Sequence, residues 1–398
     1  MSEYPIIVFT ALLIFGYGIF SKLSERSIIT APMFFVIIGM LASTFPVGIF
    51  KEGINAPFVK VIMEITLVLV LFVDASTINL KNLWKEKGLP IRLLFIGLPI
   101  TMVMGILVGI PIFKGSDIWL IALMALILSP TDAALGQAVV TSKLVPEKIR
   151  QTINVESGLN DGIALPPILV CLAALGESSG HDSGFSYWGL FTLKQFVFGP
   201  AIGGLVGWAG GWIVEKASDK GWMNDTFQRL ASIALAILAF SLAEMVHGNG
   251  FIAAFFAGLL LGTTTHSIRE RIHEFGETEA QVLELFIFLL TGMILFPIAS
   301  LYWDINAWIY AILSLTVIRM VPVWISLRGA KLPLATVAFI GWFGPRGIAS
   351  ILYLIMAIMA IGLAGHEVIF SVIILTVLLS IFLHGLSATP LSKLYKER

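Results

Sequence analysis

Long apolar blocks recur along the whole chain, and they restrict the folds open to it more than any other feature. Each block runs for about 20 residues, enough for a helix to cross a hydrocarbon core of about 30 Å. Only 13% of the residues are charged, whereas a soluble domain carries about 25%. Inside a bilayer each spanning segment must satisfy its own backbone hydrogen bonds, which favours helices. The sequence therefore predicts an all-α polytopic membrane protein.

Thirteen spans are predicted within a single transmembrane domain over residues 1–398. The N-terminus lacks the basic region of a cleaved signal peptide, so the first block is expected to remain as a helix. A short tail follows the last span, and no soluble nucleotide-binding or regulatory domain is expected. The predicted spans are 5–21, 30–49, 58–80, 90–113, 117–141, 147–175, 190–214, 227–246, 249–265, 280–300, 305–327, 332–363 and 366–388.

The basic residues indicate how these spans are oriented. With the N-terminus outside, the loops after odd-numbered spans and the C-terminal tail face the cytoplasm, and they hold most of the 25 Lys and Arg residues. This bias follows the positive-inside rule. We therefore expect an integral protein of the cell membrane with an external N-terminus and a cytoplasmic C-terminus. Apart from two arginines within spans, the remaining basic residues are Lys51, Lys60, Lys114 and Lys194.

Two of the spans are interrupted. The fifth is broken at 129–132 (Ser-Pro-Thr-Asp), and the twelfth at 341–347 (Gly-Trp-Phe-Gly-Pro-Arg-Gly). Such breaks are tolerated at membrane depth where they are buried in protein or line a cavity. The two spans lie seven apart, as in a six-span unit repeated in inverted orientation. Paired broken helices of this kind point to a transporter site near the membrane midplane.

The sixth span carries a dense polar group, Glu-Ser-Gly-Leu-Asn-Asp-Gly at 156–162. In a helix, Ser157 and Asp161 share one face, while Glu156 and Asn160 share the neighbouring face. Charges at membrane depth are costly and usually functional. Burial favours the protonated form of a carboxyl group and a nearby cation favours the ionised form. Asp161 is therefore the candidate for holding a proton and a cation in turn; alternatively, it only caps or bridges helices.

Further oxygen ligands are expected near Asp161. Thr131 can offer its hydroxyl or its carbonyl to a cation, or hold Asn160. Asp132 can neutralise positive helix ends or accept a hydrogen bond from a water on the ion, although segment 129–132 could instead be an ordinary N-cap. Asp74, toward the end of the third span, could be a ligand, an entrance charge or a solvated acid. The predicted Na⁺ ligands are Asp161, Ser157 and Thr131.

The two arginines within spans need partners at that depth. Arg319 is predicted to pair with Glu156, because each is a buried charge that otherwise lacks a partner. Arg346, in the break of the twelfth span, can neutralise the carbonyls at helix C-termini. Together with Asn160, these residues form a predicted structural network rather than a catalytic one.

Other classes of function receive less support. No metal cluster or Ser/His pair occurs at a plausible depth, so neither an enzyme nor a cofactor is expected. The zero formal net charge gives no indication of a nucleic-acid partner. Glycines 203, 204, 207, 210 and 211 of the seventh span follow no strand, so they indicate close helix packing rather than a nucleotide-binding loop.

Two other kinds of transport protein can also be weighed. A gated cation channel or efflux system is disfavoured, because its typical regulatory domain has no counterpart in the sequence. A sodium-coupled organic-anion symporter could share the broken-helix design. It would need a free basic residue near the midplane, and Arg319 and Arg346 are already assigned.

At these residues the chain resembles the monovalent cation–proton antiporter superfamily, particularly its NhaP and Na⁺/H⁺ exchanger branch. The motifs concerned are 129–132, 156–161, Arg319 and 344–347, and the resemblance extends over nearly the whole chain. It implies an NhaA-like antiporter fold with inverted six-helix repeats and two broken crossing helices. It also implies a homodimer, surrounded by membrane lipid, in which a six-helix core slides against a dimerisation domain.

The same resemblance implies roles for parts of the chain. Core helices are expected within 58–175 and 280–388, with the remainder forming the dimerisation scaffold. Asp161 would carry the ion or proton, and the Asn before it, where another branch has Asp, implies electroneutral exchange. The chain departs from the pattern at Gly158, where a larger apolar residue is expected, and at Asp74, where relatives carry Glu. The expected function is Na⁺ or Li⁺ exchange for H⁺ by alternating access, with K⁺/H⁺ exchange as the alternative.

Overall fold

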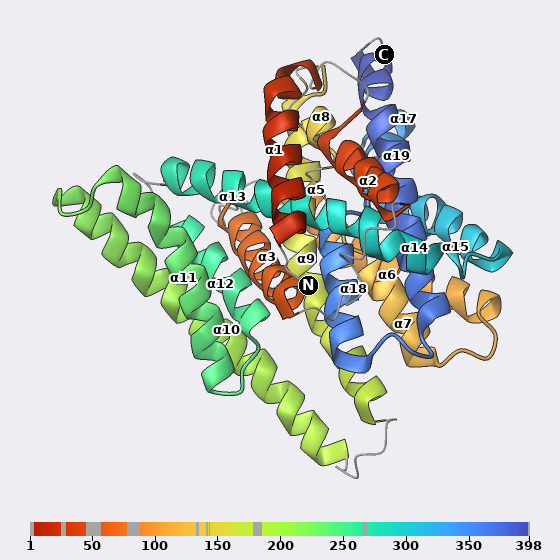
Figure 1. Ribbon diagram of the computed structural model, residues 1–398, viewed down its shortest axis with the longest axis horizontal. Helices are drawn as coiled ribbons and strands as arrows, with labels where there is room; N and C mark the ends of the chain where they lie inside the picture. The colour runs from red at the N-terminus through yellow and green to blue at the C-terminus, as the bar shows by residue number, and fades with distance from the viewer. Residues whose placement is uncertain are drawn as a thin grey trace.

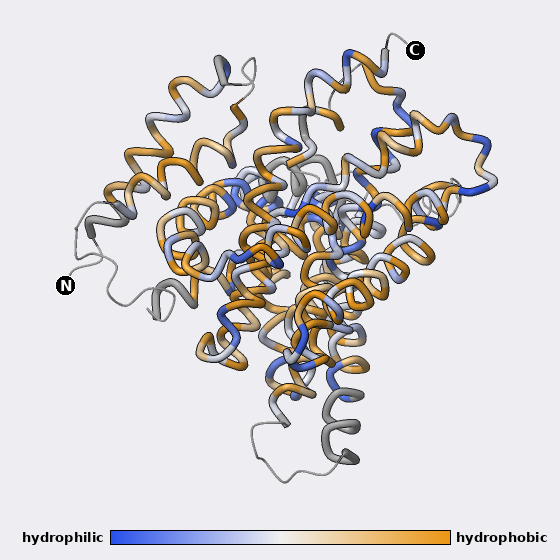
Figure 2. Tube along the Cα trace, turned by 90° about the vertical axis from the view of Figure 1, so that its right-hand side faces the viewer, coloured by the Kyte–Doolittle hydropathy of each residue, from blue (hydrophilic) through white to orange (hydrophobic). Residues whose placement is uncertain are grey.

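The computed structural model describes residues 4–24, 29–44, 57–77, 88–132, 135–140, 142, 144–177, 185–265 and 269–396. The secondary structure of these residues is helical, which confirms the all-α fold class. Seven helices among them are long and apolar enough to cross a membrane, and hydrophobic residues predominate along most of the helices in Figure 2. The count of thirteen spans stays a prediction. The described part leaves out 45–49, 78–80 and the basic residues Arg26, Lys51, Lys81, Lys85, Lys87, Lys143 and Arg398.

The elements follow one another as helices, with two short π-helical turns labelled η. They are α1 (Tyr4–Ser24), α2 (Ala31–Ser43), α3 (Pro57–Thr77), α5 (Leu89–Arg92), η3 (Leu93–Gly97), α6 (Leu98–Ile112), α7 (Ile118–Ile127), α8 (Gln137–Val140), α9 (Glu147–Glu177), α10 (Phe185–Asp219), α11 (Asp225–Met245), α12 (Gly250–Thr264), α13 (Arg269–Leu290), η4 (Thr291–Leu295), α14 (Phe296–Ser300), α15 (Ile305–Leu315), α16 (Val317–Ser326), α17 (Leu334–Trp342), α18 (Ile348–Ile361) and α19 (Glu367–Lys396).

Helices α3, α10, α11 and α12 pack together on one side of the molecule (Figure 1). Small residues let α10 approach α12 closely: a Cβ atom at Gly203 or Gly207 would overlap the backbone of Ala253 or Ala257. Such contacts between small residues are a main source of helix association in membranes. The close packing predicted for the glycines of the seventh span is therefore confirmed at positions 203, 207, 210 and 211, whereas Gly204 makes only an ordinary contact. We call these four helices the glycine-packed bundle.

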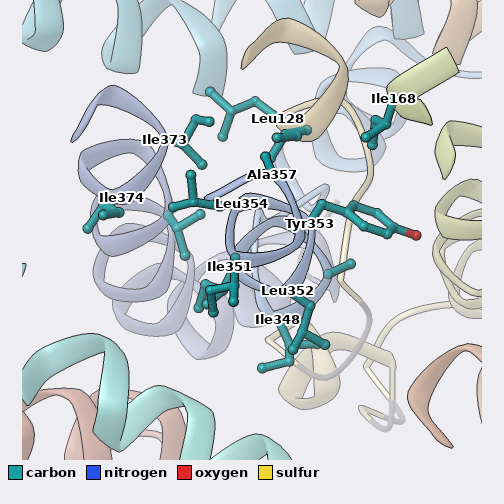
Figure 3. Close-up of a cluster of buried hydrophobic side chains, with 14 of the residues drawn as sticks. Leu128, Ile168, Ile348, Ile351, Leu352, Tyr353, Leu354, Ala357, Ile373 and Ile374 are labelled. Carbon is teal, nitrogen blue, oxygen red and sulfur yellow. The ribbon is translucent and has the colours of Figure 1, made fainter. Parts of the chain in front are cut away.

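A larger hydrophobic core surrounds α18. Side chains from α7, α9 and α19 pack against it, among them Leu128, Ile168 and Ile373 (Figure 3). In Figure 1, α18 and α9 lie near the centre of the molecule, with α19 beside them. This core supports the two interrupted spans and places their breaks inside the protein.

Both predicted interruptions are confirmed. Helix α7 ends at Ile127, and residues 129–132 are not helical. Helix α17 ends at Trp342 and α18 begins at Ile348, so 343–347 separates two half-helices. Proline at positions 130 and 345 lacks the N–H that would continue either helix.

The structure adds an interruption that the sequence did not predict. Span 305–327 is divided between α15 and α16 at Thr316, whose φ of −112° and ψ of −90° lie outside the helical range. No proline or glycine stands at this position, and the sequence is apolar on both sides of it, so the span looks continuous in the sequence. The discontinuity lies three residues before Arg319 and so affects how that side chain enters the interior.

Candidate functional site

The two non-helical segments cross and bond to each other. The backbone N–H of Asp132 donates to the carbonyl of Pro345 at 2.8 Å. The Asp132 carboxylate accepts from the N–H of Ile348 at 2.9 Å, which caps the first turn of α18. Of the two roles proposed for Asp132, this contact corresponds to neutralising a positive helix end. We call this arrangement the helix crossing, formed by 129–132 and 343–347.

Arg346 closes the opposite side of the helix crossing. Its Nη1 donates to the carbonyls of Ser129 at 2.7 Å and Pro130 at 3.1 Å, just beyond the C-terminal end of α7. Ser350 adds a hydrogen bond to the carbonyl of Ile127 at 2.8 Å. The crossing thus joins a half-helix C-terminus to an arginine and a half-helix N-terminus to an acid. Arg346 makes the contacts expected for it from the sequence.

Helix α9 places the polar segment 156–162 in the interior, beside the helix crossing. Glu156 and Arg319 form a bidentate ion pair, with N–O distances of 2.6 and 2.9 Å. Both side chains are only 1–2% exposed. This is the contact expected from the sequence, and its two parallel bonds favour arginine over lysine. The pair joins α9 to α16.

Thr131 is the hub of a second set of bonds. The Asn160 side-chain amide donates to Thr131 Oγ1 at 2.6 Å, and Thr131 Oγ1 lies 3.1 Å from Ser157 Oγ. All three side chains are buried. Spacing along α9 had placed Ser157 and Asn160 on neighbouring faces, but Thr131 reaches both, so the two faces meet at one residue of the helix crossing.

Asp161 lies on α9 one turn after Ser157 and is 4% exposed. Its Oδ1 is fully buried and accepts no hydrogen bond from the described residues, and the same holds for Oδ1 of Asn160. Buried polar oxygens are normally satisfied by a partner. Two oxygens left over next to a hydroxyl pair are suited to a hard cation or, at the carboxylate, to a proton.

Asp74 lies on α3 and is only partly buried. Its helix belongs to the glycine-packed bundle and also packs against α9. A ligand role and an entrance role are both compatible with this position, so each stays a prediction. The ligand roles of Asp161, Ser157, Thr131 and Asp132 are predictions of the same kind.

Sequence reasoning missed several polar residues that support the helix crossing. Ser380 of α19 accepts a hydrogen bond from the backbone N–H of Arg346 at 2.6 Å, and its hydroxyl lies 3.0 Å from Nδ1 of His384. From α18, Tyr353 donates to the backbone carbonyl of Asp161 at 2.9 Å. The four-residue spacing of Ser380 and His384 within an apolar helix was an available signal. Tyr353 had none, because a lone tyrosine in an apolar run reads as core.

Comparison with known proteins places the chain among transporters. The family model described as "Sodium/hydrogen exchanger, transmembrane" matches residues 8–394. Among solved structures, the sodium proton antiporter MjNhaP1 from Methanocaldococcus jannaschii at pH 8 has the same fold, with a TM-score of 0.76 and 19% identity. The alignment covers 100% of both chains.

Similar sequences carry antiporter names. The K⁺/H⁺ antiporter NhaP2 of Shewanella baltica is 27% identical over 69% of this chain, and this chain spans 47% of its length. The Na⁺/H⁺ antiporter NhaG of Bacillus atrophaeus is 27% identical over 90% of this chain and 69% of its own. The chain thus spans about half the length of the first of these relatives. Since the family model covers nearly every residue, this integral membrane protein belongs to the transmembrane sodium/hydrogen exchanger family of the monovalent cation–proton antiporter superfamily.

Proposed function

We propose that the protein exchanges Na⁺ or Li⁺ for H⁺ across a membrane, with Asp161 holding the two ions in turn. One observation carries this proposal: a buried carboxylate oxygen accepts no hydrogen bond from the described residues, although it lies one helical turn from the Ser157–Thr131 hydroxyl pair. A proton needs a single oxygen, whereas a hard alkali cation needs several. Asp161 with its neighbours can serve either ion, so competition between them follows.

Two acids near the site are already bonded to other groups, which supports electroneutral exchange. Glu156 is already paired with Arg319, and the Asp132 carboxylate caps α18. The residue before Asp161 is the neutral Asn160. One exchangeable carboxyl group then carries one Na⁺ in one direction and one H⁺ in the other, and no net charge crosses the membrane.

The helix crossing suits alternating access. Its two segments bind each other through both backbone and side chains, so they can move as one unit together with α9 and α16. Helices α10, α11 and α12 of the glycine-packed bundle would form part of the static scaffold and, in a homodimer, contribute to the dimerisation side, whereas α3 lies within the range expected for the core. We place the N-terminus outside and the C-terminus in the cytoplasm of the cell, in accord with the positive-inside rule.

A proteoliposome assay tests this function. Purified protein is reconstituted with a pH-sensitive dye inside, and Na⁺, Li⁺ or K⁺ is added while the membrane potential is clamped at different values. Cation-driven proton flux that ignores the potential supports one-for-one exchange. Flux that follows the potential contradicts the stoichiometry, and no cation-dependent flux contradicts the function itself.

K⁺/H⁺ exchange is the second candidate, and the names of several relatives favour it. The NhaP2 proteins of Shewanella and NhaP of Alkalimonas amylolytica are described as K⁺/H⁺ antiporters. Oxygen ligands alone do not select the size of the cation. In the same assay, a lower apparent KM for K⁺ than for Na⁺ would replace the first candidate with this one.

A further inference from the structure

Tyr353 joins α18 to the main chain of the ion site. Its side chain is 0% exposed, and its hydroxyl donates to the backbone carbonyl of Asp161 at 2.9 Å. Figure 3 shows the ring leaving α18 on the side opposite to Ile373 and Ile374, with the oxygen outermost. A tyrosine hydroxyl inside a bilayer requires a hydrogen-bond partner. For Tyr353 this partner belongs to Asp161, the residue proposed to hold the two exchanged ions.

The turn of α9 that follows Asp161 is weakened by its own sequence. Pro166 and Pro167 lie inside the helix and have no N–H group, so the carbonyls of Gly162 and Ile163 lose their ordinary intrahelical donors. This turn holds its shape less firmly than the rest of α9. A hydrogen bond from a neighbouring helix to the carbonyl of Asp161 therefore lies next to the two carbonyls that lack intrahelical donors.

The same turn of α9 lies between the glycine-packed bundle and α18. A Cβ atom at Gly162 would overlap the ring of Phe255 on α12, so α9 touches the glycine-packed bundle at this point. Tyr353 approaches from α18, which begins at the helix crossing. The Asp161–Gly162 backbone is thus bonded to one region and only packed against the other.

We infer that Tyr353 is a positioning residue for cation binding at Asp161. It fixes the carbonyl and thereby the direction in which the Asp161 side chain leaves α9. This inference rests on the proposed exchange function. Binding a metal cation requires several oxygens at defined positions, whereas a proton binds to one oxygen. Loosening the backbone at Asp161 should therefore weaken cation binding and leave the turnover of the saturated protein much less affected.

Tyr353→Phe tests the inference, because it removes the hydroxyl and keeps the packed ring. Tyr310→Phe is the matched control: Tyr310 is 1% exposed, and its hydroxyl likewise donates to a backbone carbonyl, that of Gly105 on α6. Both variants lose one interhelical tyrosine hydrogen bond. Initial rates of Na⁺-driven proton flux are measured in proteoliposomes over a range of Na⁺ concentrations, together with the melting temperature of each purified variant.

We expect Tyr353→Phe to raise the apparent KM for Na⁺ about three- to tenfold, the range set by one hydrogen bond, with a smaller change in the maximal rate. Tyr310→Phe should leave KM within about twofold of the wild type, even if both variants melt at similarly lower temperatures. Equal KM values for the two variants would overturn the inference and leave Tyr353 a structural residue. Absence of exchange by the wild type would instead overturn the proposed function.

Discussion

The glycine-packed bundle and the helix crossing belong to the same protein but are held together by different kinds of contact. In the bundle, glycines of α10 lie against the backbone at Ala253 and Ala257 of α12. At the crossing, the side chains of Arg346, Asp132 and Ser350 bond to backbone groups at the ends of two half-helices. The closest contacts in the bundle are made by small residues, with a few polar bonds between its helices such as Gln228 to Ser218, whereas hydrogen bonds of polar side chains join the segments of the crossing.

The difference follows from the bilayer as solvent. Lipid chains are as apolar as leucine, so burying apolar surface gives helices little reason to associate, and close contacts between small residues take over. Buried polar groups in the same solvent are costly unless they are matched. A scaffold can be built with few buried polar groups, whereas an ion site requires them. Among the described residues, Asp161 Oδ1 and Asn160 Oδ1 lack a hydrogen-bond partner, as do nitrogens of Arg319 and Arg346. Of these atoms only the oxygens can bind a cation.

The largest expected effect is on Asp161. Asp161→Asn keeps the size of the side chain but cannot cycle between a charged and a protonated state, so we expect it to abolish exchange. Cation-driven proton flux in proteoliposomes measures this, and the melting temperature and elution volume should stay near those of the wild type. Asp117→Asn is a matched control, since Asp117 is an exposed N-cap of α7 and asparagine caps equally well. Retained cation-dependent flux in Asp161→Asn would falsify the site.

The next largest effect is expected for the ion pair between Glu156 and Arg319. Arg319→Ala leaves Glu156 as a buried, unpaired charge, which costs about 3–5 kcal/mol of stability. We expect a marked loss of thermal stability in detergent, larger than any change in the preference among Na⁺, Li⁺ and K⁺. A double variant, Glu156→Gln with Arg319→Gln, should recover part of the loss because no lone charge remains. An Arg319→Ala protein as thermostable as the wild type would count against the pair.

The bundle should respond to size rather than charge. Gly207→Ala places a methyl group against the α12 backbone at Ala257, and overpacking of this kind costs about 1–3 kcal/mol. Gly204→Ala on the same helix meets only a leucine methyl group at 3.4 Å, so it should be neutral or slightly stabilising. Thermal melting of both variants checks this contrast. A lower melting temperature for Gly204→Ala than for Gly207→Ala would contradict the assigned packing.

The smallest effect concerns the cap of α18. Asp132→Ala removes the acceptor for the N–H of Ile348 and should cost about 1 kcal/mol, whereas Asp132→Asn keeps an acceptor and most of the stability. Melting temperatures separate these variants. Apparent KM values for Na⁺ then report the second role, since a raised KM in the stable Asn variant would indicate that Asp132 also acts on the ion. Equal destabilisation by both substitutions would mean that its charge, not the cap, matters.

Much of the site could be predicted from the sequence, because polar and helix-breaking residues are unfavourable in a membrane span and stand out among apolar neighbours. Proline and charged residues within apolar spans mark both breaks, and the need for a partner led from Arg319 to Glu156. The spacing of Ser157 and Asp161 followed from the helical repeat. By contrast, the discontinuity at Thr316 could not be predicted, because neither proline nor glycine stands at this position.

Other contacts could not be predicted because they depend on how distant elements approach each other. A bond between Thr131 and Asn160 was one of the expected alternatives, but helical spacing assigned Ser157 to a different face, and Thr131 lies close enough to bond to it as well. Asp132 could have capped its own helix, but it caps α18, more than 200 residues away in the sequence. Tyr353 looked like an ordinary core residue until α18 was placed beside α9.

The sequence by itself determined that the protein is helical, that it lies in a membrane, and that two spans must break, because hydropathy and the chemistry of proline and charge act locally. Only the tertiary structure decided which half-helix end each charge neutralises and which carboxylate keeps an uncommitted oxygen. Those outcomes depend on the crossing of chains that lie far apart in sequence. A hydrogen bond requires a distance near 3 Å, and the order of the residues alone does not specify it.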